Sequence, residues 1–571
     1  MKPRVWFTAA GLVLSCCALF AVAALEHDAA PASDPASLLP QGALLAVEAN
    51  DFGTLLHDWN SSPEKQAWLQ GANYESFSRS RLFERLSQAQ TEFASAAALA
   101  PDSAFLQSVA GKESCLGIYD IGKLEFVYIT RMDSAAIESS PLWLLRDKFE
   151  RRSEAGTDFY VRKDSDSSRT AAFASRDGWL ILGTREDLVA GVLDRMAGND
   201  KDSLGSEAWY AEAVKLAGAP GELRMALNLT KIVPSPYFRS YWIQQNVTEM
   251  KQYSSAVSDL KREGAIYREE RVLLRRDSNA AAPAADVRAI AALAPDGVAL
   301  SLAQAAPGPE KILQTLKEDL IERRPQAAST TQTAAPQTAT SDNAGDASQL
   351  ETPIDQAPTV VAQADPFQSL RTVLAAAQPV AMMQCYTTSG ARNDVFVSLN
   401  TAAVLEAQTP WDAQAVESAL TSALAPRLTA SELGAKWNKR TAAQGDYFAL
   451  DGPVDLFVKV DGKWLILTND SHLLDDIASR LHKTELATSS DAVTYTAAFY
   501  PARETFHYQQ LMRQLDHAGS GGQNGDSSSQ TFFTGNIGSL SQAFSSLDSE
   551  QIDERDSGSQ VRETVTYRWK Q

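Results

Sequence analysis

The sequence predicts an α+β fold: two tandem copies of one module, each a mainly antiparallel sheet flanked by helices, behind an N-terminal signal or anchor helix. Segments with the period of a strand alternate with segments of helical period, and strands often follow strands directly. Short motifs recur in the same order in the two halves of the chain. A long apolar run follows the first basic residues.

The composition is that of an acidic globular protein. The 571 residues include 52 Lys and Arg against 71 Asp and Glu, so the formal charge is −19, and 44% of the residues are hydrophobic. This hydrophobic content excludes wholesale disorder. The acidic balance argues against a nucleic-acid partner, because a phosphate backbone requires a basic surface. Four cysteines and six histidines exclude a disulfide scaffold and a cysteine-rich zinc array.

The N-terminal segment has the pattern of an export signal. Lys2 and Arg4 precede an apolar run from Val5 to Leu25, and Ala21-Val22-Ala23 supplies the small residues of a cleavage site. We therefore expect residues 1–24 to be a signal peptide or a membrane anchor. A lipoprotein box ending at Cys16 and a buried N-terminal helix are the alternatives.

The same segment predicts the location of the body. Its positive charges lie only on the N-terminal side, which favours a body outside the cytoplasm. We expect an exported protein, in the periplasm or at the outer face of the cytoplasmic membrane. If the segment is not cleaved, the membrane is a partner through residues 5–25, because this run is long enough to cross about 30 Å of hydrocarbon.

The chain repeats itself. Residues 38–45 (LLPQGALL) recur as residues 293–300 (LAPDGVAL), and residues 177–184 (DGWLILGT) recur within residues 461–468 (DGKWLILT). A helix over 250–263 followed by a strand over 265–276 matches a helix over 537–547 followed by a strand over 561–570. The repeat predicts two copies of one α+β module, and their bounds are residues 36–278 and 290–571.

Two insertions interrupt the second copy. Residues 325–365 contain no aromatic residue, Lys or Arg and are rich in Ala, Thr, Gln, Ser, Pro and Asp. Such a segment cannot bury enough apolar surface to offset its ordering entropy, so we expect a disordered insertion. Residues 519–529 (GSGGQNGDSSS) read as a flexible loop and do not meet the GxGxxG pattern.

The elements of each module follow from local patterns. Phe52, Leu55, Leu56 and Trp59 share one face of a helix that begins at Asn50 or Asp51. Asp-Gly predicts a turn before each Trp-containing strand, and Thr184 is the expected cap of the helix that follows. The expected order in the first copy is strand 43–48, that helix, strands 115–120 and 124–132, helix 141–150, hairpins over 158–183, and a helix from 184.

The sequence contains no motif that identifies catalytic, cofactor-binding or metal-binding residues. HExxH, GxSxG, CxxC and the Walker loop do not occur. The run Asp164 to Ser168 is read as a polar hairpin loop rather than a calcium loop, because Arg169 stands at its sixth position. His472 and His482, ten residues apart, do not share a helix face as ligands.

Three pairs of residues have both a structural and a functional interpretation. Trp179 and Trp464 are expected in the core, with a paired ligand platform as the alternative. Asp177 and Asp461 are read as turn residues, since nothing places them at the spacing of a glycosidase pair. Cys115 and Cys385 are read as small buried thiols rather than a disulfide.

The Leu-Pro opening, the Asp51…Leu55-Leu56…Trp59 helix and the Gly-Trp-Leu-Ile-Leu-Gly unit resemble a bacterial exported family catalogued as a domain of unknown function. The similarity is clearest in the first copy, and in the second no Trp closes the corresponding helix. The resemblance implies an exported α+β protein with a signal or a membrane anchor, and it transfers no catalytic residue.

Two functions follow as hypotheses. The first is a non-enzymatic cell-envelope protein that presents its two-module body to a protein partner or ligand. The alternative is an envelope hydrolase with a carboxylate site between the modules. A pocket with convergent, desolvated carboxylates would favour the enzyme, and a shallow or apolar groove would favour binding.

Overall fold

A computed structural model describes most of the chain between Pro35 and Lys570. The described residues are 35–70, 74, 77–79, 81–198, 202–236, 250–277, 286–321, 365–390, 397–428, 436–451, 455–481, 492–507, 510 and 546–570.

The first half of the described chain contributes ten strands to one antiparallel sheet. They are β1 (Leu45–Ala49), β2 (Ser114–Asp120), β3 (Glu125–Arg131), β4 (Glu150–Glu154), β5 (Thr157–Lys163), β6 (Thr170–Arg176), β7 (Trp179–Gly183), β8 (Leu223–Leu227), β9 (Tyr253–Glu263) and β10 (Ile266–Arg275). The hydrogen-bonded order is β4-β5-β6-β7-β3-β2-β1-β8-β9-β10.

The second half of the described chain contributes ten more strands in the same order. They are β11 (Leu300–Ala305), β12 (Pro379–Ser389), β13 (Ser398–Ala407), β14 (Lys436–Ala442), β15 (Gly445–Asp451), β16 (Leu456–Asp461), β17 (Trp464–Thr468), β18 (Tyr495–Phe499), β19 (Leu547–Asp556) and β20 (Gln560–Trp569). Their order is β14-β15-β16-β17-β13-β12-β11-β18-β19-β20, so each strand holds the place of the strand ten numbers lower.

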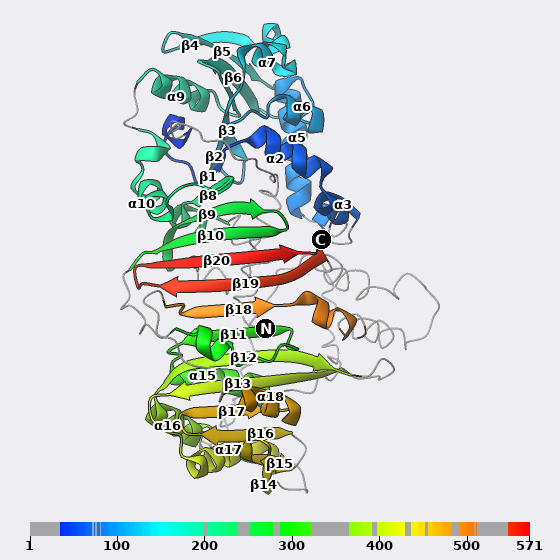
Figure 1. The fold of residues 1–571 in the computed structure, drawn as a ribbon. Coiled ribbons are helices and arrows are strands. Elements are labelled where there is room, and N and C mark those ends of the chain that lie inside the picture. The colour runs from blue at the N-terminus through cyan, green and yellow to red at the C-terminus, as the bar shows by residue number, and fades with distance from the viewer. Residues whose placement is uncertain are drawn as a thin grey trace, which may run out of the picture.

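Strands β10 and β20 join the halves into one continuous sheet. They run antiparallel from the pair Ile266–Arg568 to the pair Leu274–Gln560, with Glu270 opposite Thr564. Glu270 lies six residues after the turn glycine Gly264, and Thr564 lies six residues after the turn glycine Gly558. An approximate twofold axis therefore passes through the pair Glu270–Thr564. Figure 1 shows the strands stacked along the long axis, with β10 and β20 in the middle.

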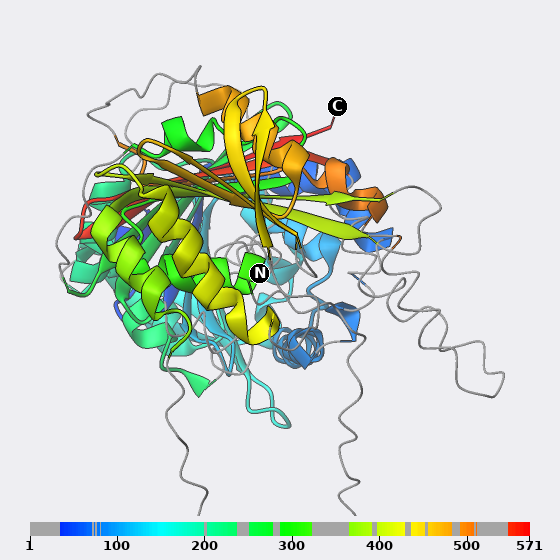
Figure 2. The same ribbon diagram turned by 90° about the horizontal axis from the view of Figure 1, so that it is seen from below.

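Helices cover both faces of each half. In the first half they are α2 (Phe52–Ser61), α3 (Pro63–Gln70), α5 (Arg81–Ala97), α6 (Ser103–Ser108), α7 (Ser134–Ser139), α8 (Pro141–Leu144), α9 (Glu186–Met196), α10 (Ala208–Ala217) and α11 (Leu229–Ile232). In the second half they are α14 (Arg288–Ala291), α15 (Pro309–Leu316), α16 (Gln368–Ala377), α17 (Ala413–Leu428) and α18 (Ser471–Leu481). Figure 2 shows the pair α16 and α17 lying along one side of the sheet.

Each half has hydrophobic cores on both faces of the sheet, because successive strand residues point to opposite faces. In the first half, Ile129 and Ile181 pack with Val189 of α9, and Phe173 packs on the other face with Phe105 of α6. In the second half, one core packs α14 and α18 on the sheet and the other packs α15, α16 and α17. Apolar strands with alternate residues in different cores therefore build a three-layer structure.

The predicted fold class, α+β with a large antiparallel sheet and flanking helices, is confirmed. Asp51 caps α2, because its carboxylate accepts the Thr54 N–H at 2.9 Å. Asp177 and Gly178 form the predicted turn between β6 and β7, both with positive φ, 50° and 79°. Thr184 lies just before α9, but its hydroxyl bonds to the backbone of Phe126 rather than capping the helix.

One predicted element is wrong. The helix expected over 250–263 is strand β9, whose residues alternate between buried and partly exposed. The helix expected over 141–150 is shorter, because α8 ends at Leu144, a single 3₁₀ turn follows, and β4 begins at Glu150.

Four predicted segments concern undescribed residues. Residues 1–24, residues 519–529, all of 325–365 except Asp365, and all of the helix expected over 537–547 except its last two residues lie outside the described part of the chain. Asp365 belongs to the fold, because its carboxylate accepts the Phe367 N–H at 3.0 Å and pairs with Arg371 at 2.7 Å.

Candidate functional site

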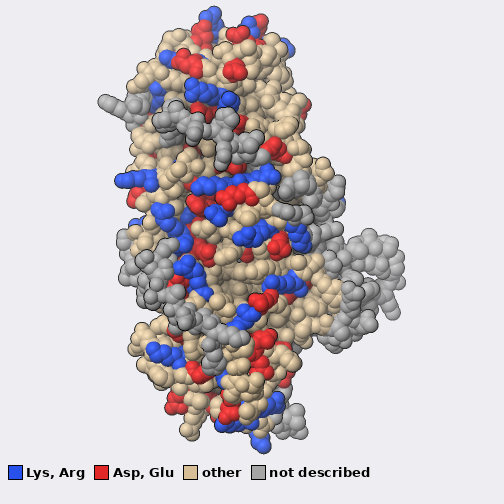
Figure 3. Space-filling view, viewed as in Figure 1, with Lys and Arg blue, Asp and Glu red and all other residues tan. Residues whose placement is uncertain are grey.

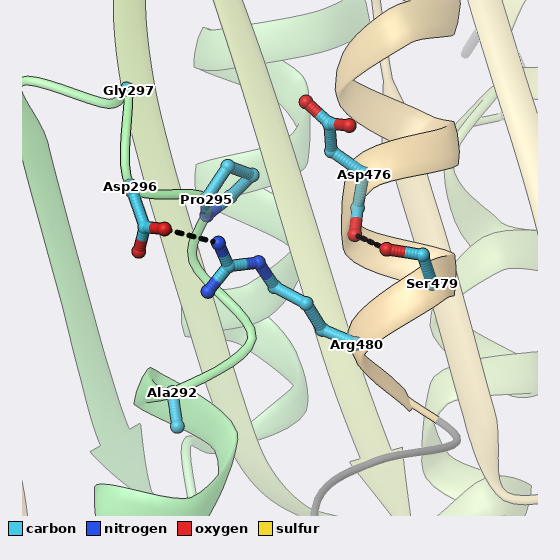
Figure 4. A pocket seen from close by; sticks show the side chains of 7 residues that line it. All are labelled: Ala292, Pro295, Asp296, Gly297, Asp476, Ser479 and Arg480. Carbon is cyan, nitrogen blue, oxygen red and sulfur yellow. Dashed lines mark hydrogen bonds and ion pairs between the residues drawn. The ribbon is translucent and has the colours of Figure 1, made fainter.

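A polar surface pocket lies between the turn before β11 and the C-terminal end of α18. Its volume is about 530 Å³. The residues that line it are Ala292, Pro295, Asp296, Gly297, Asp476, Ser479 and Arg480. Figure 4 shows the turn and the helix facing each other, with the Arg480 side chain reaching across from α18 to Asp296. The pocket therefore joins two segments that lie far apart in the sequence.

Opposite charges meet in this pocket. Arg480 Nη2 lies 3.0 Å from Asp296 Oδ2, and the Asp296 side chain is 93% exposed while that of Arg480 is 31% exposed. Ser479 Oγ donates to the carbonyl of Asp476 at 2.8 Å, so this hydroxyl is bonded to its own helix rather than to a base. The lining residues offer hydrogen bonds and charge for binding, and they contain no nucleophile held by a general base.

A second group of charged residues lies at the junction of the halves. Arg271 on β10 pairs with Glu269 at 2.6 Å and with Glu563 on β20 at 3.3 Å. All three side chains are less than 20% exposed. Burial alone would raise the pKa of the Glu269 carboxyl, but Arg271 and the Ser258 hydroxyl hold it below its usual value. One guanidinium thus contacts both carboxylates and favours the ionised form of Glu269, which does not suit a protonated general acid.

Charges of both signs also cover the surface. Figure 3 shows Lys and Arg interspersed with Asp and Glu across the middle of the molecule, where Figure 1 shows β10, β20 and β19. On this part of the sheet Lys261 pairs with Glu270 at 3.6 Å, with both side chains at least 40% exposed. Exposed pairs of this kind contribute at most about 1 kcal/mol, and they define no binding site.

The structure separates the residues that the sequence paired. Trp179 is 5% exposed and lies in the core beneath α9, while Trp464 is partly buried against the core beneath α18. Strands β7 and β17 are thirteen steps apart in the sheet, or about 60 Å at roughly 4.8 Å per strand. Asp177 and Asp461 occupy the turns before these strands, so neither pair is brought together.

The described cysteines and histidines form no metal site. Cys115 and Cys385 form no disulfide, and each is buried in a different half. Burial raises the pKa of the Cys385 thiol to about 12. Within the described ranges, no group of three or more His, Cys, Asp and Glu side chains is arranged to hold a metal ion. Across those same ranges, no helix has both the length and the apolarity to span a membrane.

The sequence identified Pro295, Asp296 and Gly297 only as part of a repeated motif. It did not predict the pocket that they line together with residues of α18. Asp476, Ser479 and Arg480 were not singled out. One signal was available, because an arginine stands one residue before the end of both α9 and α18, as Arg195 and Arg480.

Comparison with known proteins identifies no family for this chain. No protein-family model matches the chain, and no curated protein matches it. A solved structure described as "Structure of crystal form I of TP0453" is similar at a TM-score of 0.20 and 9% sequence identity, over 44% of this chain and 81% of that chain. A likeness at this TM-score carries no argument about function.

Proposed function

We propose that the protein is a non-enzymatic binding protein of the cell envelope, whose two-module body is presented to a protein partner or ligand. The observation that carries this proposal is the pocket between the turn before β11 and α18. It is open to solvent, lined by polar and charged groups, and without an activated nucleophile among its lining residues. Such a pocket suits recognition rather than bond cleavage.

The carboxylates at the junction support the same proposal. A hydrolase site between the modules would need one carboxyl kept protonated beside one that is ionised. Arg271 contacts Glu269 and Glu563 and lowers the pKa of Glu269, so Glu269 is not the carboxyl held protonated as the general acid. The hydrolase alternative therefore receives no support from these residues.

The proposal includes an origin by duplication. Both halves have the same strand order, and equivalent residues meet at the centre of the β10–β20 pair. We take residues 36–278 and 290–571 as two copies of one module, and the second copy as the one that kept an open pocket.

The proposed location rests on the sequence. Lys2, Arg4 and the run from Val5 to Leu25 support export, with the body in the periplasm or at the outer face of the cytoplasmic membrane. A reporter that is active only in the cytoplasm, fused after Gln571, should be inactive. Activity of that fusion would contradict the proposed location.

The binding role is tested by site-specific cross-linking in intact cells. A photoreactive residue at Ser479, at the wall of the pocket, should cross-link to an envelope component. The matched control is the same residue at Asp194, which holds the place of Ser479 one residue before the helix arginine in the first half. Equal cross-linking at both positions, or at neither, would contradict a binding role for this pocket.

A further inference from the structure

In the first half, the place that corresponds to this pocket is occupied by a segment of the chain itself, residues 202–207. Residues 202–207 lie on the turn before β1. The carbonyl of Asp202 accepts the Gln41 N–H at 2.9 Å and the Arg195 guanidinium at 3.1 and 3.2 Å. The Leu204 N–H donates to the Leu39 carbonyl at 2.8 Å.

Two more contacts complete this arrangement. Pro40 and Ser203 form an antiparallel bridge, and the Glu207 carboxylate accepts the Gly42 N–H at 3.1 Å. The Leu204 side chain is fully buried in the core beneath α9. The turn therefore holds an extended segment by its backbone, by one apolar side chain and by one carboxylate.

Every lining residue of the pocket has a counterpart in this arrangement. The turns correspond because β1 begins three residues after Gly42 and β11 begins three residues after Gly297. The helices correspond because α9 and α18 each have eleven residues and each follows the Trp-containing strand. The counterparts of Ala292, Pro295, Asp296, Gly297, Asp476, Ser479 and Arg480 are Ser37, Pro40, Gln41, Gly42, Gly191, Asp194 and Arg195.

The second half has a shorter connection at this place in its sequence. Between the helix and the next strand there are 26 residues in the first half (197–222) and 13 in the second (482–494). Counted from the end of the helix, Ala492 is the counterpart of Glu207. Glu207 lies eleven positions after Met196, the last residue of α9, and Ala492 lies eleven positions after Leu481, the last residue of α18.

Ala492 is held far from the turn. Its neighbour Val493 accepts the Val287 N–H at 3.0 Å, and Thr494 accepts the Ala305 N–H at 2.8 Å. Ala305 lies eight residues along the chain from Gly297, which is about 25 Å in extended backbone. Ala492 therefore cannot reach Gly297 as Glu207 reaches Gly42.

We propose that this pocket binds an extended segment of a partner polypeptide, in the way that the first half binds its own residues 202–207. The inference rests on the proposed binding role and names the class of partner. In the proposed complex, Arg480 and the Asp296 N–H donate to the backbone carbonyl of one ligand residue, as Arg195 and Gln41 do to Asp202. The Ala294 carbonyl accepts the N–H of the ligand residue two positions later, as Leu39 does from Leu204. The Gly297 N–H donates to a ligand carboxylate five positions after the first residue, as Gly42 does to Glu207.

The test measures binding of a peptide with the sequence of residues 201–208 (KDSLGSEA) to the full-length protein by fluorescence polarisation. We expect saturable binding that Arg480→Ala weakens about tenfold, as loss of one charged hydrogen bond predicts. A peptide with Gly for Leu204 and Gln for Glu207 should also bind more weakly. The matched control is Arg151→Ala, which removes an arginine from another surface Arg–Asp pair, on β4 at the end of the sheet; it should leave binding unchanged.

The following outcomes would overturn the inference. No binding, or binding that Arg480→Ala leaves unchanged while the melting temperature is normal, would overturn the inference. Binding that appears only after residues 482–491 are replaced by a Gly-Ser linker would also overturn it, because the pocket would then belong to the chain's own segment. Failure of the peptide with retained cross-linking at Ser479 would remove this inference and leave the proposed binding role standing.

Discussion

Arg224 on β8 and Asp259 on β9 form a fully buried, two-pronged ion pair. Arg224 Nε and Nη2 each donate to an Asp259 carboxylate oxygen at 2.8 Å, and the side chains are 3% and 2% exposed. Asp259 also accepts the Gly221 N–H at 3.0 Å, and Arg224 donates to the Gly218 carbonyl at 2.8 Å. The pair thus fixes the chain that connects α10 to β8.

Asp259→Ala should lower the free energy of unfolding by about 3–5 kcal/mol, because it leaves a guanidinium buried without its counter-charge. The double variant Arg224→Met, Asp259→Leu should recover most of this loss, since neither residue then carries a buried charge. Urea unfolding measures both. If Asp259→Ala lowered the free energy of unfolding by less than the double variant does, this account of the pair would be contradicted.

The two tryptophans should differ in their contribution to stability. Trp179→Ala should cost about 3–5 kcal/mol, because the indole is buried and its loss leaves a cavity beneath α9. Trp464→Ala should cost less, because its side chain is only partly buried. The sequence alone predicts equal costs, so equal values in urea unfolding would contradict the difference in burial.

Asp164 should make stability depend on pH in the acid range. It accepts hydrogen bonds from the side chain and backbone of Ser167 and from Ser95, which lower its pKa to about 2. A carboxyl with a lowered folded pKa stabilises the fold above its unfolded value, about 3.9, and loses this contribution as the pH falls toward 2.

The wild type should therefore be more stable than Asp164→Asn at pH 6, and the difference should shrink between about pH 4 and pH 2. Urea midpoints at these pH values measure the difference. Asp166→Asn, in the same turn, is the matched control. A difference that stayed constant down to pH 2 would show that the carboxylate charge has no part in it.

The two buried thiols should be inert in the folded protein. Burial raises the pKa of Cys385 to about 12, and Cys115 is fully buried. Because the thiolate is the reactive form, a disulfide reagent at pH 8 should modify neither residue in the native state and both after unfolding in urea. The measurement uses a background with Cys16→Ser and Cys17→Ser. Rapid reaction of either thiol in the folded protein would contradict its burial.

Local sequence signals determined much of the secondary structure. Asp51 caps α2 through its own carboxylate, and Asp177-Gly178 makes a turn because both residues tolerate positive φ. The strand expected over 561–570 is β20, in which Val561 and Val565 alternate with polar residues. These features depend on residues within a few positions of one another, so the sequence by itself was sufficient.

Strand β9 shows where local signals fail. A helix was expected over 250–263, and Tyr253, Ala256, Val257 and Leu260 do have the spacing of one helix face. In the structure the segment pairs with β8 and β10 and buries Asp259 against Arg224, 35 residues away. Neither the strand partners nor the partner of this charge can be read from the segment itself.

The sequence by itself determined the fold class, a number of individual helices and strands, and the recurring motifs. Only the tertiary structure decided the pairing of β10 with β20, which makes one sheet of the two halves, and the meeting of Asp296 with Arg480, 184 residues apart. The physical reason is range. Caps, turns and side-chain periodicity act within one element, whereas edge pairing and pocket formation depend on which distant surfaces the packed layers bring together.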